Sequence, residues 1–266
     1  MNEIELAFTP CPNDTFTFHA MLHDCVDTGP FLFNPHIHDV ETLNLKAFNK
    51  EFQVTKLSIF AYLQLKDSYQ MLDSGAALGY GCGPMVVARS PDIPLREARV
   101  AVPGMYTTAN LMLKLWDPEI RNVEITSFEK ILPGIASGAY DAGVIIHEGR
   151  FVYPNYDCVK IVDLGEWWQT MTGLPIALGC IAIRKDVALR PFKTDIQVII
   201  RRSIQYAFDH RGASRKFVKE YAQEMDDGVI DSHIDLYVND FSLELGTLGA
   251  QAIEMLEEMA KWRRIL

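Results

Sequence analysis

Short apolar runs alternate along this chain with longer segments whose apolar residues recur at helical spacing. Residues 4–8, 100–102 and 144–146 are runs of the first kind, and residues 194–210 and 247–265 show the helical spacing. Such runs predict strands buried in a sheet, and their alternation with helices predicts an α/β protein. Residues 31–37 are expected to form one arm of a hairpin.

The polar residues that follow residues 144–146 are the strongest candidates for chemistry. The predicted strand ends at His147, which is followed by Glu148, Gly149 and Arg150. Open α/β sheets bind ligands at the carboxyl ends of their strands, and an imidazole exchanges a proton near neutral pH. We therefore predict His147 as a general base. The alternative is a histidine that only completes a strand end, and the role of Glu148 stays open.

Three predicted junctions between a strand and a helix carry further candidates. Asn13 follows the first strand, and Lys56 and Ser58 end another. Thr107 and Thr108 follow a glycine turn and precede an amphipathic helix. The N–H groups at such helix starts form common anion sites, and lysine or hydroxyl side chains can bind a carboxylate. The structural alternative is that these polar residues only cap their helices and that Lys56 lies on the surface.

Two extended segments indicate how the chain is divided. Prolines near residue 91 and an extended stretch near residue 175 bracket a middle unit. We therefore expect residues 96–176 to form a smaller α/β lobe, inserted between residues 1–95 and 177–266 of a larger one. Two lobes joined by two crossings form a hinged cleft that can close and exclude water. The candidates expected to face each other across it are Asn13, Lys56, Ser58, Thr107, Thr108 and His147.

Composition narrows the classes of function. The 266 residues are 48% hydrophobic and carry a formal net charge of -10, without a dense Lys/Arg block. This disfavours binding to nucleic acid or to an anionic membrane, and no apolar run approaches the roughly 20 residues of a membrane helix. The first residues lack the pattern of a signal peptide, and the five scattered cysteines predict reduced thiols in a cytoplasmic protein. Cys11 is expected to be structural.

Several segments of the chain resemble the 1,4-dihydroxy-6-naphthoate synthase family. The most specific is His-Glu-Gly-Arg-Phe at residues 147–151, and Val152 and Ala177 are two departures, where Thr and Pro are expected. The resemblance spans nearly the whole chain. The other matching segments are residues 10–16, 56–58, 107–109, 167–168, 172–175, 222–225, 233–234 and 237–239.

The resemblance implies a two-lobed fold like that of type II periplasmic binding proteins, but in a cytoplasmic enzyme. The family belongs to the futalosine route to menaquinone (vitamin K2), and it acts without a metal or an organic cofactor. It converts cyclic dehypoxanthinyl futalosine, a small-molecule carboxylate, to 1,4-dihydroxy-6-naphthoate and dihydroxyacetone, which makes it a carbon–carbon lyase. The histidine that matches His147 is the proposed proton acceptor. The residues that match substrate contacts are Lys56, Leu57, Ser58, Thr107 and Thr108.

Two other functions stay open at this point. One is the chorismate dehydratase of the same pathway, and the other is a non-catalytic protein that binds a small carboxylate. The pair Trp167–Trp168 is expected either to line an apolar pocket or to pack a domain interface. The pattern leaves the oligomeric state open between a monomer and a homodimer.

Overall fold

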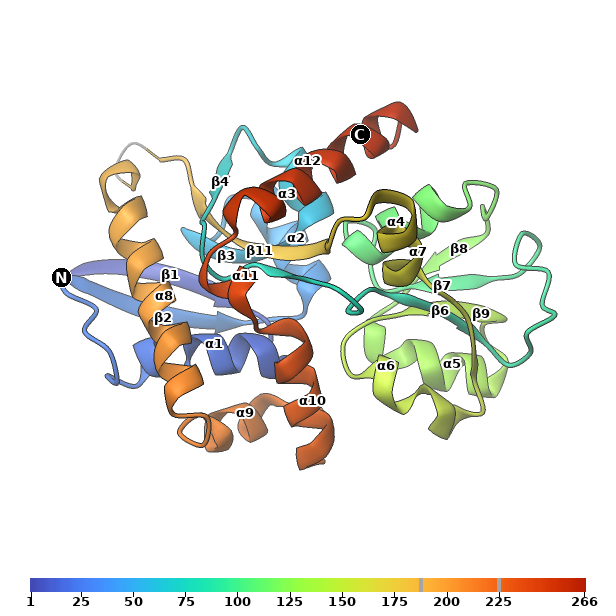
Figure 1. Ribbon diagram of the computed structural model, residues 1–266, viewed down its shortest axis with the longest axis horizontal. Helices are drawn as coiled ribbons and strands as arrows, with labels where there is room; N and C mark the ends of the chain where they lie inside the picture. Colours follow the sequence, from blue (N-terminus) through green and yellow to red (C-terminus); the bar gives the residue numbers. More distant parts are fainter. Residues whose placement is uncertain (187–188, 224–225) are drawn as a thin grey trace.

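The described residues of the computed structural model, 1–186, 189–223 and 226–266, form two α/β lobes that lie side by side (Figure 1). Glu224 and Met225, part of one segment of the resemblance, lie outside them. The sheet of the first lobe has the strand order β2-β1-β3-β11-β4, and β5 also pairs with β11. Its strands are β1 (Asn2–Phe8), β2 (Phe31–Ile37), β3 (Val54–Ser58), β4 (Tyr69–Met71), β5 (Ala77–Gly79) and β11 (Ile176–Arg184).

The helices of the first lobe come from both ends of the chain. Helix α1 packs against α8, α9 and α10, so the first part of the chain and the last third share one core. The helices are α1 (Pro12–Leu22), α2 (Val40–Phe48), α3 (Ile59–Gln64), α8 (Lys193–Asp209), α9 (Arg215–Tyr221), α10 (Asp227–Tyr237), α11 (Asp240–Leu243) and α12 (Gly246–Trp262).

The second lobe contains a sheet of order β10-β6-β9-β7-β8. Strand β7 runs parallel to β8 and β9, whereas β6 is antiparallel to β9 and β10. Its strands are β6 (Met85–Ala88), β7 (Val100–Val102), β8 (Val123–Ile125), β9 (Ala142–Ile145) and β10 (Val159–Asp163). Its helices are α4 (Thr108–Trp116), α5 (Ile131–Ser137), α6 (Gly149–Val152) and α7 (Leu164–Thr172).

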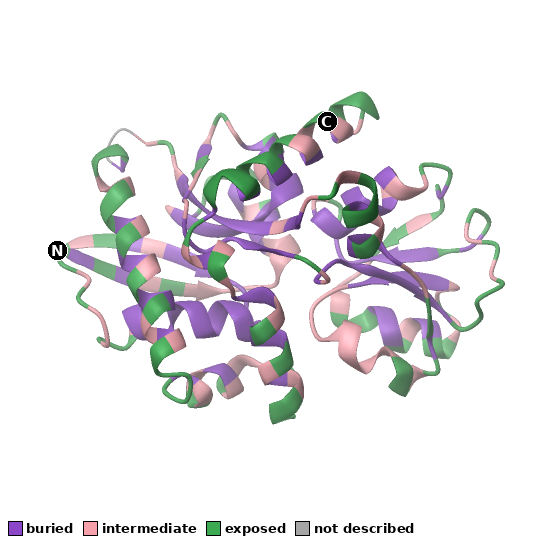
Figure 2. Ribbon diagram, viewed as in Figure 1, coloured by how far each residue is buried: buried purple, intermediate pink, exposed green. Residues whose placement is uncertain are grey.

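The strands predicted from apolar runs are buried. All residues of β3, β7 and β9 are buried, as expected for strands covered on both faces (Figure 2). The expected hairpin at residues 31–37 is wrong, because β2 runs parallel to β1, with Asn2 opposite Phe31 and Phe8 opposite Ile37. A parallel neighbour requires a long crossover, and the segment between the two strands contains helix α1.

The chain crosses between the lobes at residues 80–84 and again at residues 173–175. The boundary expected after residue 95 assigned Met85–Ala88 to the first lobe, whereas this strand pairs with β9 and β10 of the second. The difference arises because Pro91 and Pro94 lie in a loop of the second lobe and not at a junction. We therefore propose that the inserted lobe comprises residues 85–172.

The first crossing is fastened to the second lobe by a group of close contacts. Arg150 donates to the carbonyl oxygen of Gly83 at 2.9 Å and to the carboxylate of Asp163 at 2.6 Å. The other oxygen of Asp163 accepts from the N–H of Gly165 at 2.9 Å, at the start of α7. Gly83 and Gly165 then lie so close that an ideal Cβ on Gly83 would be 2.3 Å from the backbone of Gly165. Neither glycine has room for a side chain.

We predict that Gly83→Ala lowers the free energy of unfolding by roughly 1–3 kcal/mol, because the new methyl group meets backbone atoms that cannot rotate away. Urea unfolding measures this change. Gly212→Ala is the control, since an ideal Cβ there meets nothing within 4 Å. Equal stabilities of the two variants would contradict the close contact.

Candidate active site

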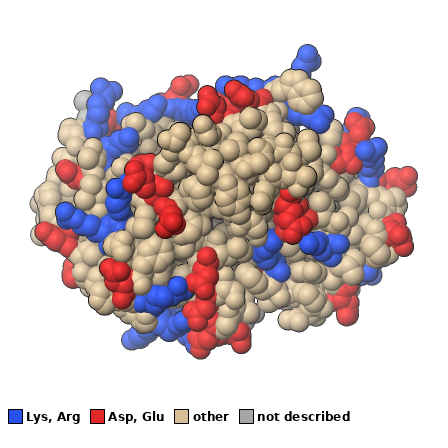
Figure 3. Space-filling model, viewed as in Figure 1, with Lys and Arg blue, Asp and Glu red and all other residues tan. Residues whose placement is uncertain are grey.

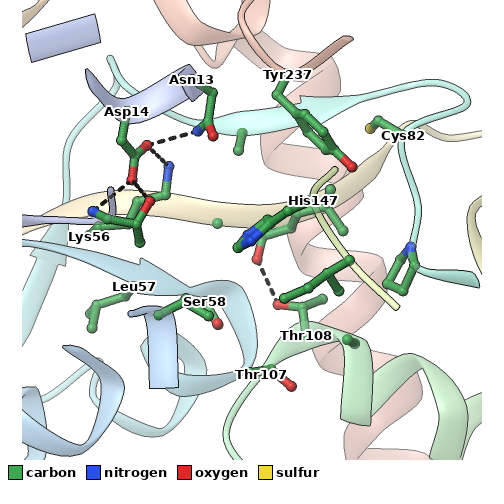
Figure 4. A pocket seen from close by; sticks show the side chains of 18 residues that line it. Asn13, Asp14, Lys56, Leu57, Ser58, Cys82, Thr107, Thr108, His147 and Tyr237 are labelled. Atoms are coloured by element: carbon green, nitrogen blue, oxygen red, sulfur yellow. Dashed lines mark hydrogen bonds and ion pairs between the residues drawn. The ribbon is translucent and has the colours of Figure 1, made fainter. Parts of the chain in front are cut away.

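A pocket lies between the lobes, with an empty volume of about 620 Å³ that includes the solvent at its mouth. Every site residue predicted from the sequence lines it, from both lobes (Figure 4). Most of the other lining residues are apolar, among them Val40, Ala77, Ile146 and Leu178. The residues predicted to line it were Asn13, Lys56, Leu57, Ser58, Thr107, Thr108 and His147.

A buried ion pair forms one wall of the pocket. Lys56 Nζ lies 2.8 Å from Asp14 Oδ1, and both side chains are less than a tenth exposed. Asp14 also accepts from the N–H and hydroxyl of Thr9 and from the Asn13 amide. Lys56 is therefore not on the surface. It is paired within the protein, so any ligand carboxylate would share its ammonium with Asp14.

Asn13 connects this pair to His233. The Asn13 amide nitrogen donates to Asp14 at 2.9 Å, so its oxygen faces His233 Nε2, also at 2.9 Å. An amide oxygen only accepts, which makes Nε2 the protonated nitrogen of His233. Burial and the neighbouring His147 lower the pKa of His233 well below its usual value, so the ring is neutral. Its Nδ1 has no hydrogen-bond partner among the described residues.

His147 reaches across the cleft from the second lobe. It follows β9 with φ of 53°, a left-handed conformation that turns its side chain away from the line of the strand. Its Nδ1 lies 3.3 Å from Cys11 Sγ of the first lobe, and the edge of its ring contacts Phe128. Burial lowers the pKa of His147 to about 4, with opposing contributions from Asp14 and Lys56. The imidazole is therefore uncharged near neutral pH.

Cys11 contacts His147 but is a poor nucleophile. Burial and the nearby Glu148 raise the pKa of its thiol well above the usual value. A neutral thiol is much less reactive than a thiolate. The structure thus agrees with a structural role. Glu148 itself lines two other pockets, together with Gln223, and is not among the described residues of the cleft pocket.

The two threonine hydroxyls are already bonded within the protein. Thr107 caps α4 by accepting from the N–H of Asn110, and it donates to the carbonyl oxygen of Gly104. Thr108 donates to the carbonyl oxygen of Leu178 at 2.7 Å and accepts from the N–H of Phe60, both in the first lobe. What the helix start offers a ligand is therefore its first N–H groups, which have no partner within a helix.

Leu57, Ser58 and the Trp pair differ in how they relate to the pocket. Leu57 lines the pocket, but its side chain is fully buried in the core. Ser58 begins α3 without a side-chain cap bond, and its hydroxyl accepts from the amide of Asn44. The Trp pair is part of the packing, since Trp168 is fully buried and donates to the carbonyl oxygen of Pro175. Neither tryptophan is among the described residues that line the pocket.

Sequence reasoning missed several lining residues. Asp14, Cys82, Leu178 and Tyr237 lie far apart along the chain, and only Asp14 stands beside a predicted residue. The motif at residues 10–16 and the resemblance at residues 237–239 contained Asp14 and Tyr237, which could have been assigned to the pocket. Cys82 and Leu178 carry no local signal of this kind.

The charges of the pocket differ from those of the exterior. Acidic and basic side chains are intermixed over the face shown in Figure 3. In the pocket, the charged lining residues of the described chain are the paired Asp14 and Lys56, and the helix starts at Asn13 and Thr108 add partial positive charge. Such a site suits an apolar ligand with one negative group.

Residues 1–186, 189–223 and 226–266 lack two further features. They contain no group of three or more His, Cys, Asp or Glu side chains arranged to hold a metal ion. Within these same ranges, no helix combines the length and the apolar composition that crossing a membrane requires.

We predict that His147 of the ligand-free protein titrates with a midpoint of about 4. An NMR titration of its ring protons measures this, with the signals assigned by their loss in His147→Gln. The control is the urea-unfolded chain, in which the same signals should titrate near the ordinary value of about 6.5. A midpoint near that ordinary value in the folded protein would contradict the burial argument.

Comparison with known proteins shows what the whole chain is similar to. A family model described as menaquinone biosynthesis matches residues 4–262. A 1,4-dihydroxy-6-naphthoate synthase of Thermus thermophilus is 44% identical over 263 residues, covering 99% of this chain and 96% of that protein. The synthase of the same name from Streptomyces coelicolor is 41% identical over 258 residues, covering 95% and 91%.

Solved structures agree on the fold. A protein of Archaeoglobus fulgidus superposes with a TM-score of 0.94 at 37% identity, covering 99% of this chain and 98% of that one. A Candida albicans gene product, described as having the generic periplasmic binding protein fold, gives a TM-score of 0.71 at 13% identity over 100% and 91% of the chains. The fold is that of periplasmic binding proteins, as the family resemblance implied.

Proposed function

Because the chain belongs to the menaquinone biosynthesis family, as a homologue of 1,4-dihydroxy-6-naphthoate synthases, we propose that it is such a synthase. It would convert cyclic dehypoxanthinyl futalosine to 1,4-dihydroxy-6-naphthoate and dihydroxyacetone in the cytoplasm. The observation that carries this proposal is the position of His147, a neutral imidazole in the wall of a largely apolar interlobe pocket.

The pocket matches the chemistry of this substrate in two respects. The product is a flat aromatic acid, and the lining offers apolar surface from residues such as Val40, Ile146 and Leu178. Because the charge of Lys56 is already balanced by Asp14, the carboxylate of the ligand depends on neutral hydrogen-bond donors. The N–H groups that open α4, at Thr108 and Ala109, supply such donors at the pocket.

His147 is the proposed proton acceptor. Its Nδ1 side is occupied by Cys11 Sγ at 3.3 Å, and Nε2 lies farther from the sulfur, at 3.9 Å. A proton held on Nδ1 and directed at the sulfur leaves the Nε2 lone pair for the substrate. Because the pKa of the ring is about 4, the base is present in its active form at neutral pH. Removal of a substrate proton would then start the carbon–carbon cleavage.

We predict that His147→Gln lowers kcat by roughly a hundred- to ten-thousand-fold, the usual contribution of a general base. The measurement is chromatography of the naphthoate formed from cyclic dehypoxanthinyl futalosine, with calorimetry to show that the variant still binds. His210→Ala is the matched control, since this histidine is exposed and outside the pocket-lining residues of the described chain. A variant as active as the native protein would remove His147 from the mechanism.

The same assay separates the rival functions. Turnover of chorismate in place of the cyclic substrate would identify a chorismate dehydratase. Binding of either carboxylate without turnover by the native protein would identify a binding protein. The family assignment favours the synthase over both, because the two named relatives share more than 40% of their residues with this chain.

A further inference from the structure

We propose that Asn44 and Glu41 of helix α2 are positioning residues. They orient the hydroxyl of Ser58 toward the ligand and couple this orientation to the docking of the second lobe. The part that concerns the ligand rests on the proposed function, whereas the part that concerns docking does not. Asn44 and Glu41 are not among the described residues that line the pocket.

The amide of Asn44 holds Ser58 from two sides. The Ser58 N–H donates to Asn44 Oδ1 at 3.0 Å, and Asn44 Nδ2 donates to Ser58 Oγ at 3.1 Å. The first bond fixes the orientation of the amide, because a backbone N–H requires the oxygen. Both side chains are buried, Asn44 completely, so water does not compete for these contacts. The hydroxyl oxygen of Ser58 therefore acts as an acceptor.

The acceptor role determines what the hydroxyl of Ser58 can do. Its proton is left to donate elsewhere, and no hydrogen bond of the described residues uses it. Ser58 lines the pocket, and Figure 4 shows its side chain between Leu57 and the threonines at the start of α4. The free donor is thus available to an oxygen of the ligand. A hydrogen bond from a neutral hydroxyl to a charged oxygen is among the stronger kinds in proteins.

The second N–H of the Asn44 amide leads to the other lobe. It donates to Glu41 Oε2 at 3.2 Å, and the Glu41 carboxylate accepts the N–H of Tyr106 at 3.1 Å and 3.2 Å. The loop before α4 approaches so closely that an ideal Cβ on Gly104 would lie 2.5 Å from the carboxyl group of Glu41. The rings of Phe48 and Tyr106 pack over this contact, with centroids 4.5 Å apart.

These bonds form one continuous chain from the ligand to the lobe contact. It runs from the Ser58 hydroxyl through Asn44 and Glu41 to the N–H of Tyr106, immediately before Thr107 and Thr108. The donor on the first lobe and the helix start on the second are therefore placed by the same carboxylate. Docking of the second lobe holds Glu41, Glu41 accepts the second N–H of the Asn44 amide, and the amide directs the Ser58 proton into the pocket.

The sharpest test is Asn44→Asp. This variant keeps an acceptor for the Ser58 N–H but replaces the donor to Ser58 Oγ by an acceptor, so the hydroxyl proton turns from the ligand to the new carboxylate. It also removes the bond to Glu41 Oε2, and Glu41→Ala measures the part of the effect that comes from that loss. We expect KM to rise roughly 10- to 100-fold with kcat within a few-fold of native, the effect of losing a hydrogen bond made by bound substrate. Ser58→Ala should give the same change, and the double variant no more than either alone.

The controls separate positioning from damage to the fold. Asn49→Asp adds the same charge to the exposed end of α2 and should leave KM unchanged. If the losses of Ser58→Ala and Asn44→Asp multiply in the double variant, Asn44 does not act through Ser58 and the proposal is wrong. A fall in kcat alone, with KM unchanged, would also overturn it.

The docking half of the proposal has its own readout, which does not depend on turnover. Hydrogen exchange of the Tyr106 amide should become at least about 10-fold faster in Glu41→Ala, because its acceptor is lost. Lys46→Ala, on the side of α2 that pairs with Glu51, is the control and should leave that rate unchanged. Unchanged exchange in Glu41→Ala would overturn the docking contact. Absence of any turnover by the native protein would instead refute the proposed function.

Discussion

The buried ion pair between Asp14 and Lys56 is the interaction on which the rest of the pocket depends. It joins the start of α1 to β3, and Asp14 also accepts hydrogen bonds from the N–H and the hydroxyl of Thr9, which follows β1. Removing two charges from water is costly unless each has several partners, and here the carboxylate accepts from four donors. Loss of either member would leave an uncompensated buried charge at the point where three elements meet.

The same pair controls the histidines of the cleft. Through Asn13 it fixes the tautomer of His233, because the amide can turn only its oxygen toward that ring. The two charges act on the pKa of His147 in opposite directions, since Asp14 raises it and Lys56 lowers it. Burial therefore makes the largest contribution and lowers the pKa. A base with a pKa of about 4 is neutral but weak. A bound carboxylate nearby would raise that pKa and strengthen the base where it is needed.

The sequence predicted the parts of this arrangement that depend on local pattern. His147 was found because an apolar run ends there, and Asn13, Ser58 and Thr108 because each stands where a strand gives way to a helix. The contacts that define the site are not local. Asp14 and Lys56 are 42 positions apart, and Asn13 and His233 are 220 apart. Hydrophobic periodicity identifies elements and their faces but not which side chains meet across them.

The interlobe contacts also show what the Thr108 hydroxyl bonds to within the protein. It joins the lobes through Leu178 and Phe60, and ligand binding by the threonines stays a prediction. A hinge motion about the crossings at residues 80–84 and 173–175 would exchange these bonds for bonds to water. Each such exchange costs only about 1 kcal/mol net. The few hydrogen bonds of Thr108 therefore add little to the cost of separating the lobes, whereas the close contact of Gly83 with Gly165 fixes the first crossing against the second lobe.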